Sequence, residues 1–209
     1  MIIIVDYGMG NLRSVQKAFE ACGVKPKITS SAADIEKADK IVLPGVGSFG
    51  HAMQELKKRK LVAPLKEKIA DGTPYLGLCL GMQLLFSSSE EGNVRGLDVL
   101  PGEVKRFSAK MRGGPAFGGQ GHLKVPHMGW NTLDVRNKGG MLKGVKASDH
   151  FYFVHSYFVA PEEKGDVAST TDYGKAFCSS VLRGNIFATQ FHPEKSQDAG
   201  LRIIRNFAT

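Results

Sequence analysis

Cys79 lies in a segment whose sequence predicts a reactive thiol. The chain reads Pro-Tyr-Leu-Gly-Leu-Cys-Leu-Gly-Met-Gln at 74–83, which indicates a short apolar strand, a Gly-x-Cys-x-Gly turn and a helix. This is the layout of a nucleophile elbow, with a thiol in place of the hydroxyl. Small residues prevent collisions at such a turn, and the following helix aims free N–H groups at the sulfur, which favours the thiolate. A buried structural cysteine is the alternative, because free cysteine is often buried.

His192 and Glu194 form a second chemical element near the end of the chain. The residues Ile-Phe-Ala-Thr-Gln-Phe at 186–191 indicate a strand, and Pro193 both ends it and keeps His192 extended. In an extended chain residues two apart point the same way. The imidazole is therefore expected to face a nucleophile while the carboxylate holds its other nitrogen, as in a catalytic triad. For an isolated His-x-Glu a surface turn would be the simpler interpretation, but the cysteine elbow favours a triad.

The third element is a strand that ends in a glycine-rich loop, Pro-Gly-Val-Gly-Ser-Phe-Gly at 44–50. Its glycines match the G-x-G-x-x-G pattern of dinucleotide-binding loops. Proline inside the turn argues against such a site, and so does the missing acidic residue at the end of a following strand about 20 residues on. We therefore do not predict a nucleotide cofactor.

The same loop suits a different chemical task. Backbone N–H groups of Gly45, Val46 and Gly47, together with the N–H of Leu80, could stabilise an oxyanion that forms beside Cys79. Glycines let a peptide turn its N–H toward or away from that point. The sequence thus predicts an oxyanion hole and a switch in one loop.

Taken in this order, the three elements resemble the class I (triad) glutamine amidotransferases, and the resemblance covers the whole chain. The motifs that carry it are Pro-Gly-Val-Gly-Ser-Phe-Gly at 44–50, Gly-Leu-Cys-Leu-Gly-Met-Gln at 77–83 and Gln-Phe-His-Pro-Glu-Lys-Ser at 190–196. The resemblance implies an α/β, flavodoxin-like fold with a mostly parallel sheet flanked by helices and added antiparallel strands in the C-terminal half. It also implies hydrolysis of glutamine by a Cys79–His192–Glu194 triad.

Further segments are similar to the amidotransferases of histidine biosynthesis within this family. These are Asp-Tyr-Gly-Met-Gly-Asn-Leu at 6–12, Pro-His-Met-Gly-Trp-Asn at 126–131 and Phe-Val-His-Ser-Tyr-Phe at 153–158. The resemblance implies a heterodimer with a (β/α)8-barrel cyclase subunit, which receives ammonia through a sealed path. It places Asn11, Trp130, Tyr152 and Lys195 on the face that meets the barrel.

The resemblance also supplies the residues that would hold the substrate glutamine. They are expected to line one pocket, and they are Gln83, Glu91, Ser156 and Tyr157, with Gly47 and Leu80 in the wall. One departure is the glycine-rich stretch at 110–122, which is longer than the family pattern and predicts a flexible loop.

Two other functions stay open from the sequence. One is the glutaminase subunit of another triad amidotransferase, such as pyridoxal phosphate synthase; the 126–131 segment and Lys195 favour the histidine pathway. The other is a non-enzymatic flavodoxin-like binding module with a redox-sensing cysteine. Labelling of Cys79 by a glutamine-mimicking electrophile would exclude the binding module.

Composition narrows the class of protein. A length of 209 residues suits a single α/β domain, residues 1–209, and no apolar run approaches the ~18–20 residues of a membrane span. The start has neither a basic lead nor a signal-peptide core, and three cysteines fit no disulfide framework, so a reducing cytoplasm is expected. The net charge is +8, and the densest basic run, at 57–60, contains no aromatic residue. This pattern favours a solvated helix face or a surface that meets an acidic partner over a nucleic-acid-binding site.

The remaining histidines do not form a metal site by spacing. None of the six histidines shows a His-x-x-x-His pair, so no metal is predicted. His155 alternates with apolar residues in an aromatic strand, where a core or gate-lining role is expected.

The expected order of elements is typical of a sheet covered on both faces. Strands are predicted at 1–6, 25–29, 40–43 and 74–78, helices at 11–22, 51–58, 61–71, 80–87 and 197–207, and strands with short turns over 103–191. Cys79 would then lie at the carboxyl end of a strand, where open α/β sheets build their sites.

Overall fold

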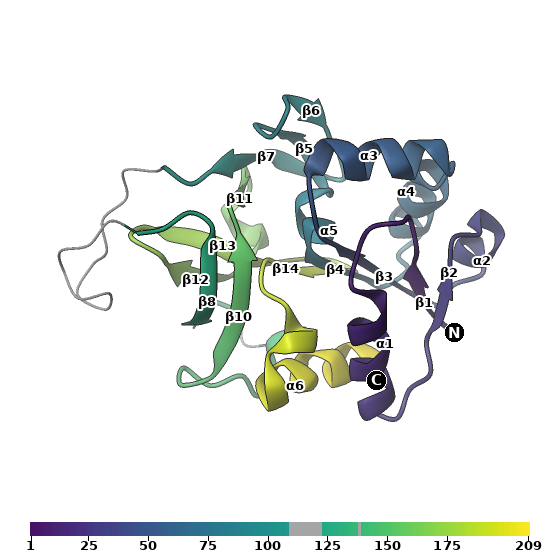
Figure 1. Ribbon diagram of the computed structural model, residues 1–209. Helices are drawn as coiled ribbons and strands as arrows, with labels where there is room; N and C mark the ends of the chain where they lie inside the picture. Colours follow the sequence, from purple (N-terminus) through teal and green to yellow (C-terminus); the bar gives the residue numbers. More distant parts are fainter. Residues whose placement is uncertain (109–122, 138) are drawn as a thin grey trace.

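The computed structural model describes residues 1–108, 123–137 and 139–209, and it shows an α/β fold with helices on both faces of a large mixed sheet (Figure 1). The glycine-rich stretch at 110–122 lies outside the described residues. The strands are β1 (Ile2–Val5), β2 (Lys27–Thr29), β3 (Lys40–Gly45), β4 (Tyr75–Cys79), β5 (Phe86–Ser89), β6 (Val94–Arg95), β7 (Leu100–Arg106), β8 (His127–Thr132), β9 (Asp134–Val135), β10 (His150–His155), β11 (Tyr157–Pro161), β12 (Val167–Asp172), β13 (Ala176–Arg183) and β14 (Ile186–Thr189). The helices are α1 (Leu12–Ala21), α2 (Ala32–Glu36), α3 (Phe49–Lys58), α4 (Val62–Ala70), α5 (Leu80–Gln83) and α6 (Gln197–Ala208), with short 3-10 turns η2 (Gly140–Leu142), η3 (Lys164–Asp166) and η4 (Pro193–Lys195).

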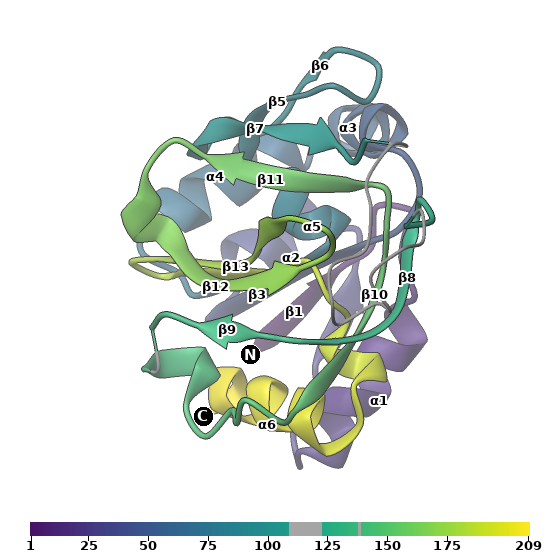
Figure 2. The same ribbon diagram turned by 90° about the vertical axis from the view of Figure 1, so that its left-hand side faces the viewer.

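The main sheet is parallel in its first half and mostly antiparallel in its second. Its order is β2-β1-β3-β4-β14-β13-β11-β7-β5-β6, and β2, β1, β3, β4 and β14 run parallel. β13, β11 and β7 continue as antiparallel neighbours, while β8 and β10 form a separate antiparallel pair. Figure 2 shows this second half from its outer side. The predicted fold class is confirmed.

Alternation of apolar side chains explains why both faces of the sheet are covered. In β1, Ile3 and Val5 pack into one core with α3 and α4, whereas Ile2 and Ile4 pack into a second core with α1 and α6. β3 divides in the same way, because successive strand residues point to opposite faces. Figure 1 shows the two helix pairs on opposite sides of the sheet.

The predicted helix at 80–87 is wrong in its second half. α5 ends at Gln83, and β5 begins at Phe86. The intervening carbonyls bond to a later segment: Leu84 O accepts from Leu97 N at 2.8 Å, and Leu85 O accepts from Val99 N and Leu100 N at 2.9 and 3.0 Å. Long-range pairing has therefore replaced helix propensity here. The short helix α2 was not predicted.

Glycine allows α5 to lie directly against the sheet. A Cβ at Gly81 would overlap the backbone carbonyl of Leu43 in β3, and one at Gly77 would lie 2.8 Å from Gly81 O and 3.0 Å from Ala188 Cβ. The nearest atoms belong to the backbone or are Cβ atoms of Leu43 and Ala188, and none of them is the flexible end of a long side chain. The Gly-x-Cys-x-Gly spacing is therefore a packing requirement of this turn.

We predict that Gly81→Ala destabilises the protein strongly, because the backbone of β3 must move to admit the methyl group. The loss of unfolding free energy should be on the order of 3 kcal/mol, at the upper end of overpacking costs. Gly165→Ala is the matched control, since a Cβ there meets nothing within 4 Å. Urea unfolding of both variants checks this, and equal midpoints would contradict the packing argument.

Candidate active site

Cys79 stands at the junction of β4 and α5 in a strained backbone conformation. Its φ of 53° and ψ of −104° are unusual for a residue with a side chain. Strain of this kind is the signature of a nucleophile elbow, which turns the chain sharply and leaves the side chain at the end of the strand. Because α5 has a single turn, its dipole contributes less to thiolate stability than the sequence suggested.

Gln190 provides a direct contact to the sulfur. Its Nε2 donates to Cys79 Sγ at 3.5 Å, and its Oε1 accepts from Gln83 Nε2 at 3.1 Å. Sequence reasoning missed Gln190 as a site residue. The period of two that paired His192 with Glu194 could have found it, since Gln190 precedes His192 by two.

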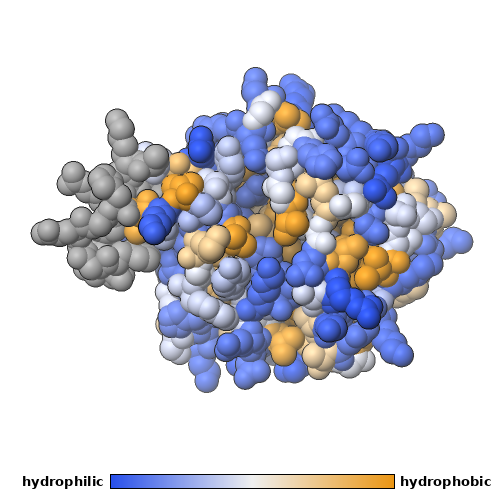
Figure 3. All heavy atoms as spheres, in the orientation of Figure 1, coloured by the Kyte–Doolittle hydropathy of each residue, from blue (hydrophilic) through white to orange (hydrophobic). Residues whose placement is uncertain are grey.

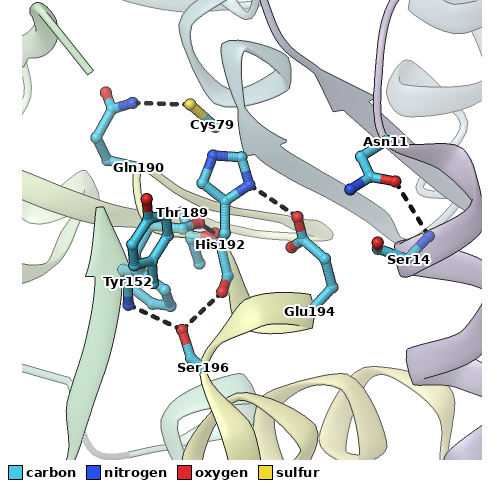
Figure 4. A network of polar contacts seen from close by, with 10 residues as sticks. Asn11, Ser14, Cys79, Tyr152, Thr189, Gln190, His192, Glu194 and Ser196 are labelled. Atoms are coloured by element: carbon cyan, nitrogen blue, oxygen red, sulfur yellow. Dashed lines mark hydrogen bonds and ion pairs between the residues drawn. The ribbon is translucent and has the colours of Figure 1, made fainter. Parts of the chain in front are cut away.

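His192 lies between Cys79 and Glu194, as Figure 4 shows. Its Nδ1 contacts Glu194 Oε1 at 2.7 Å, and the two side chains are 3% and 2% exposed. Among the described residues, His192 Nε2 has no hydrogen-bond partner. The chain is extended at His192 but not at Glu194, which lies in η4; Pro193 begins that turn, so the pair meets through a tight turn and not along a strand.

The environment of His192 favours its charged form. Burial lowers the pKa of the imidazole, but the negative charge of a Cys79 thiolate and the carboxylate of Glu194 together raise the pKa to about 10. A protonated imidazole beside a thiolate is the resting state of many catalytic cysteines. The site thus favours a charged imidazole that a buried carboxylate holds in place.

Ser196 links His192 to strand β10 by hydrogen bonds. Its Oγ donates to His192 O at 2.6 Å and accepts from Tyr152 N at 3.0 Å, while His192 N donates to Tyr152 O at 2.9 Å. Figure 4 shows the two contacts of Ser196 below the imidazole. A displacement of β10 would therefore move the imidazole with it.

His155 and His127 are buried neighbours that do not compete as bases. His155 Nδ1 lies 2.8 Å from Tyr157 O, and its Nε2 lies 3.0 Å from His127 Nδ1. One tautomer satisfies both contacts, with His155 donating to the carbonyl and accepting from His127. Burial lowers the pKa of His127 to about 4 and that of His155 to about 3, so both rings are neutral at neutral pH.

One pocket brings most of the predicted site residues together. It has a volume of about 430 Å³, within the range of small-molecule sites. Its walls combine the thiol and imidazole with the predicted loop and substrate residues: Val46, Gly47, Cys79, Leu80, Gln83, Glu91, Pro126, Val154, His155, Ser156, Tyr157 and His192. Gly45 lies just beyond the wall, beside Leu80 and Gly81. Glu194 stands behind His192, outside the pocket lining.

The four residues predicted to meet a partner fall into two groups, three at the β8–β10 pair and one at the start of α1. Trp130 and Tyr152 pack edge to face with ring centroids 5.9 Å apart, and Lys195 Nζ lies 5.7 Å from the Tyr152 ring centre. Asn11 instead caps α1, where its side chain accepts from Ser14 N at 3.3 Å. Met128 and Trp130 are the most exposed large apolar residues of the β8–β10 pair, and Figure 3 shows apolar side chains in the middle of this face within a hydrophilic surround.

The described residues contain no cluster of three or more His, Cys, Asp or Glu side chains that could hold a metal ion. In the part of the chain that the structure describes, no helix has the length and apolar character needed to span a membrane.

Comparison with known proteins places the chain in a family. The family model described as glutamine amidotransferase class-I matches residues 3–209. The chain is 51% identical over 209 residues to imidazole glycerol phosphate synthase subunit HisH of Syntrophotalea carbinolica, covering 99% of this chain and 98% of that protein. It is 54% identical to the protein of the same name from Rhodopirellula baltica, with 100% and 97% covered.

Solved structures show the same fold at low sequence identity. A glutamine amidotransferase matches with a TM-score of 0.74 and 19% identity over 100% of both chains. A chain of the PurLQS structure from Thermotoga maritima matches with a TM-score of 0.74 and 18% identity, covering 99% of this chain and 96% of its own. The protein is a member of the class-I glutamine amidotransferase family.

Proposed function

We propose that this chain is the glutaminase subunit of an imidazole glycerol phosphate synthase, acting as one domain over residues 1–209. The observation that carries the proposal is a single pocket in which Cys79 and His192 face Gln83, Glu91 and Tyr157. The names of the relatives, about half identical over the whole chain, point to the same enzyme. A redox-sensing module would not need a substrate-sized pocket with a carboxylate and amide groups in its walls.

Glutamine binding follows from the chemistry of the pocket walls. Glu91 is the one carboxylate among the described lining residues, and it suits the α-ammonium group of an amino acid. Its Oε2 accepts from Phe49 N at 2.8 Å, which fixes the carboxylate at the start of α3. Gln83 and the chain at Ser156 and Tyr157 supply neutral polar groups for the rest of the substrate.

The reaction then proceeds by covalent catalysis. The Cys79 thiolate attacks the side-chain amide carbon of glutamine, and the carbonyl electrons move to oxygen. The N–H of Leu80 and one from the Gly45–Gly47 loop stabilise that oxyanion. His192 gives its Nε2 proton to the nitrogen, which leaves as ammonia, and a γ-glutamyl thioester remains. His192 then takes a proton from water, whose oxygen attacks the thioester and releases glutamate and the thiolate.

The ammonia requires a second active site close by. Free ammonia becomes ammonium in water and loses its nucleophilic lone pair, so a sealed path is needed. We propose that the partner is the (β/α)8-barrel cyclase of the synthase, bound as a heterodimer on the face with Trp130, Tyr152 and Lys195, near Asn11. The Ser196 link from β10 to His192 supports coupling between this face and the site.

Cys79→Ala tests the nucleophile. In the complex with the cyclase we expect no glutamine hydrolysis, because no other group supplies a thiolate at this position. Synthesis driven by added ammonium salts should survive, since the cyclase needs only the nitrogen. Cys178→Ala is the control, a buried thiol outside the pocket that should retain activity. Glutamate release by Cys79→Ala would refute the mechanism.

The titration of His192 tests the ion pair. Its folded pKa is raised, so its charge stabilises the native state fully below pH ~6.5 and loses this effect as pH rises through about 10. NMR of the ring should show a protonated imidazole at neutral pH in the wild type. Cys79→Ala should lower this pKa because the thiolate charge is lost while burial persists. Cys178→Ala should not change it; a wild-type pKa near or below ~6.5 would contradict the pair.

Lys195→Ala tests the coupling to the partner. Lys195 directly follows the His192–Glu194 pair and lies over the Tyr152 ring, so its loss should loosen the partner face without touching the pocket. We expect glutamate release to exceed imidazole glycerol phosphate formation in the variant complex. Lys57→Ala, on the exposed side of α3, should keep the ratio of products equal to that of the wild type. Equal product amounts in Lys195→Ala would remove Lys195 from the coupling.

A further inference from the structure

Tyr7 carries a buried hydroxyl that no part of the proposed mechanism uses. The residue lies two positions after the end of the short strand β1 and is 0% exposed. Within the described part of the chain, its Oη has no hydrogen-bond partner. A buried donor without an acceptor costs free energy, so such a group calls for an explanation.

The hydroxyl points at the start of the loop predicted to form the oxyanion hole. A Cβ at Gly45 would collide with Tyr7 Oη, and it would also lie 2.9 Å from Leu80 Cβ and 3.3 Å from Gly81 N. The hydroxyl, the loop and the first N–H groups after Cys79 therefore converge on one point. Gly45 is the residue that leaves room for the hydroxyl there.

A second residue of the same segment packs on the same loop. A Cβ at Gly47 would lie 2.8 Å from Met9 Cε, and Gly47 adopts a φ of 94° in the left-handed region. The segment after β1 thus abuts both glycines of the Gly45–Gly47 loop. A change in the loop must be accommodated by Tyr7 and Met9.

Tyr75 shows what a purely structural buried tyrosine looks like in this protein. It is also 0% exposed, but its hydroxyl donates to Gly81 O at 3.0 Å. Burial raises the pKa of Tyr7, and the nearby charge of Cys79 raises it further, so the hydroxyl keeps its proton. Tyr7 therefore offers a neutral donor that has no acceptor in this state.

We infer that Tyr7 is a positioning residue for the oxyanion loop: its hydroxyl donates to the Gly45 carbonyl when the Gly45–Val46 peptide turns its N–H toward the oxyanion. The N–H and C=O of a peptide point in opposite directions, so turning one toward the substrate turns the other into the protein. A carbonyl turned inward needs a donor. Tyr7 supplies it, and the loop state that catalyses the reaction gains a hydrogen bond that the resting state lacks. This inference rests on the proposed glutaminase function.

Tyr7→Phe tests the inference because it removes the hydroxyl and keeps the ring. In the complex with the cyclase, kcat for glutamine hydrolysis should fall about tenfold with KM little changed, less than the effect of losing an oxyanion donor itself. Alkylation of Cys79 by iodoacetamide should keep its rate, since displacement of iodide develops no oxyanion. The melting temperature should stay equal or rise, because an unpaired buried hydroxyl has been removed.

Tyr75→Phe is the matched control for stability. It removes a paired hydroxyl of equal burial, so its melting temperature should fall. Wild-type kcat in Tyr7→Phe would overturn the inference, and so would a change in alkylation rate as large as the change in kcat, because the hydroxyl would then act on the sulfur. If the wild-type complex releases no glutamate from glutamine, the proposed glutaminase function is wrong, and the inference about Tyr7 is wrong with it.

Discussion

The close approach of α5 to the parallel strands is the constraint on which the rest of the site depends. Gly81 lies against the backbone of β3, and Gly77 lies against Gly81 and β14. In this packing the chain turns sharply and holds Cys79 at a φ of 53°. The neighbouring strands then determine what faces the sulfur: β3 ends in the Gly45–Gly47 loop, and the segment after β14 brings Gln190 and His192.

A second constraint links the site to the far half of the chain. His192 is held from one side by Glu194 and from the other by the backbone of Tyr152 through Ser196. Because β10 pairs with β8, the edge that exposes Trp130 is one strand away from the imidazole. A partner bound to that edge needs only to favour one arrangement of β10 or of the oxyanion loop to change activity.

Much of the fold follows from local patterns in the sequence. The continuous apolar run from Ile2 to Val5 is typical of a strand covered on both faces, and its residues contribute to both cores. The nucleophile elbow can also be predicted from the sequence, because glycines two residues before and two residues after a cysteine are typical of this turn. By contrast, the end of α5 depends on carbonyls that bond to residues 97–100, and no local pattern reveals that choice.

In the site, too, some features follow from local sequence patterns and others only from contacts in the folded chain. The expected substrate residues lie at or just beyond the ends of strands and of α5, and these ends meet at one pocket. The turn η4 was missed, although Pro193 permits both a strand end and a helical first turn. The contacts of Ser196 and the unpaired hydroxyl of Tyr7 arise between segments far apart in sequence, so only the folded chain reveals them.

The central claim is that Cys79, in a pocket built for glutamine, is the one reactive thiol of this chain. The most direct measurement is to incubate the protein with a glutamine analogue that carries an electrophilic carbon in place of the side-chain amide and to map the adduct by mass spectrometry. Our account predicts one adduct, on Cys79, whose formation glutamine slows, while Cys22 and Cys178 stay unmodified. An adduct on either of those two cysteines at a comparable rate, or labelling of Cys79 that glutamine does not slow, would contradict it.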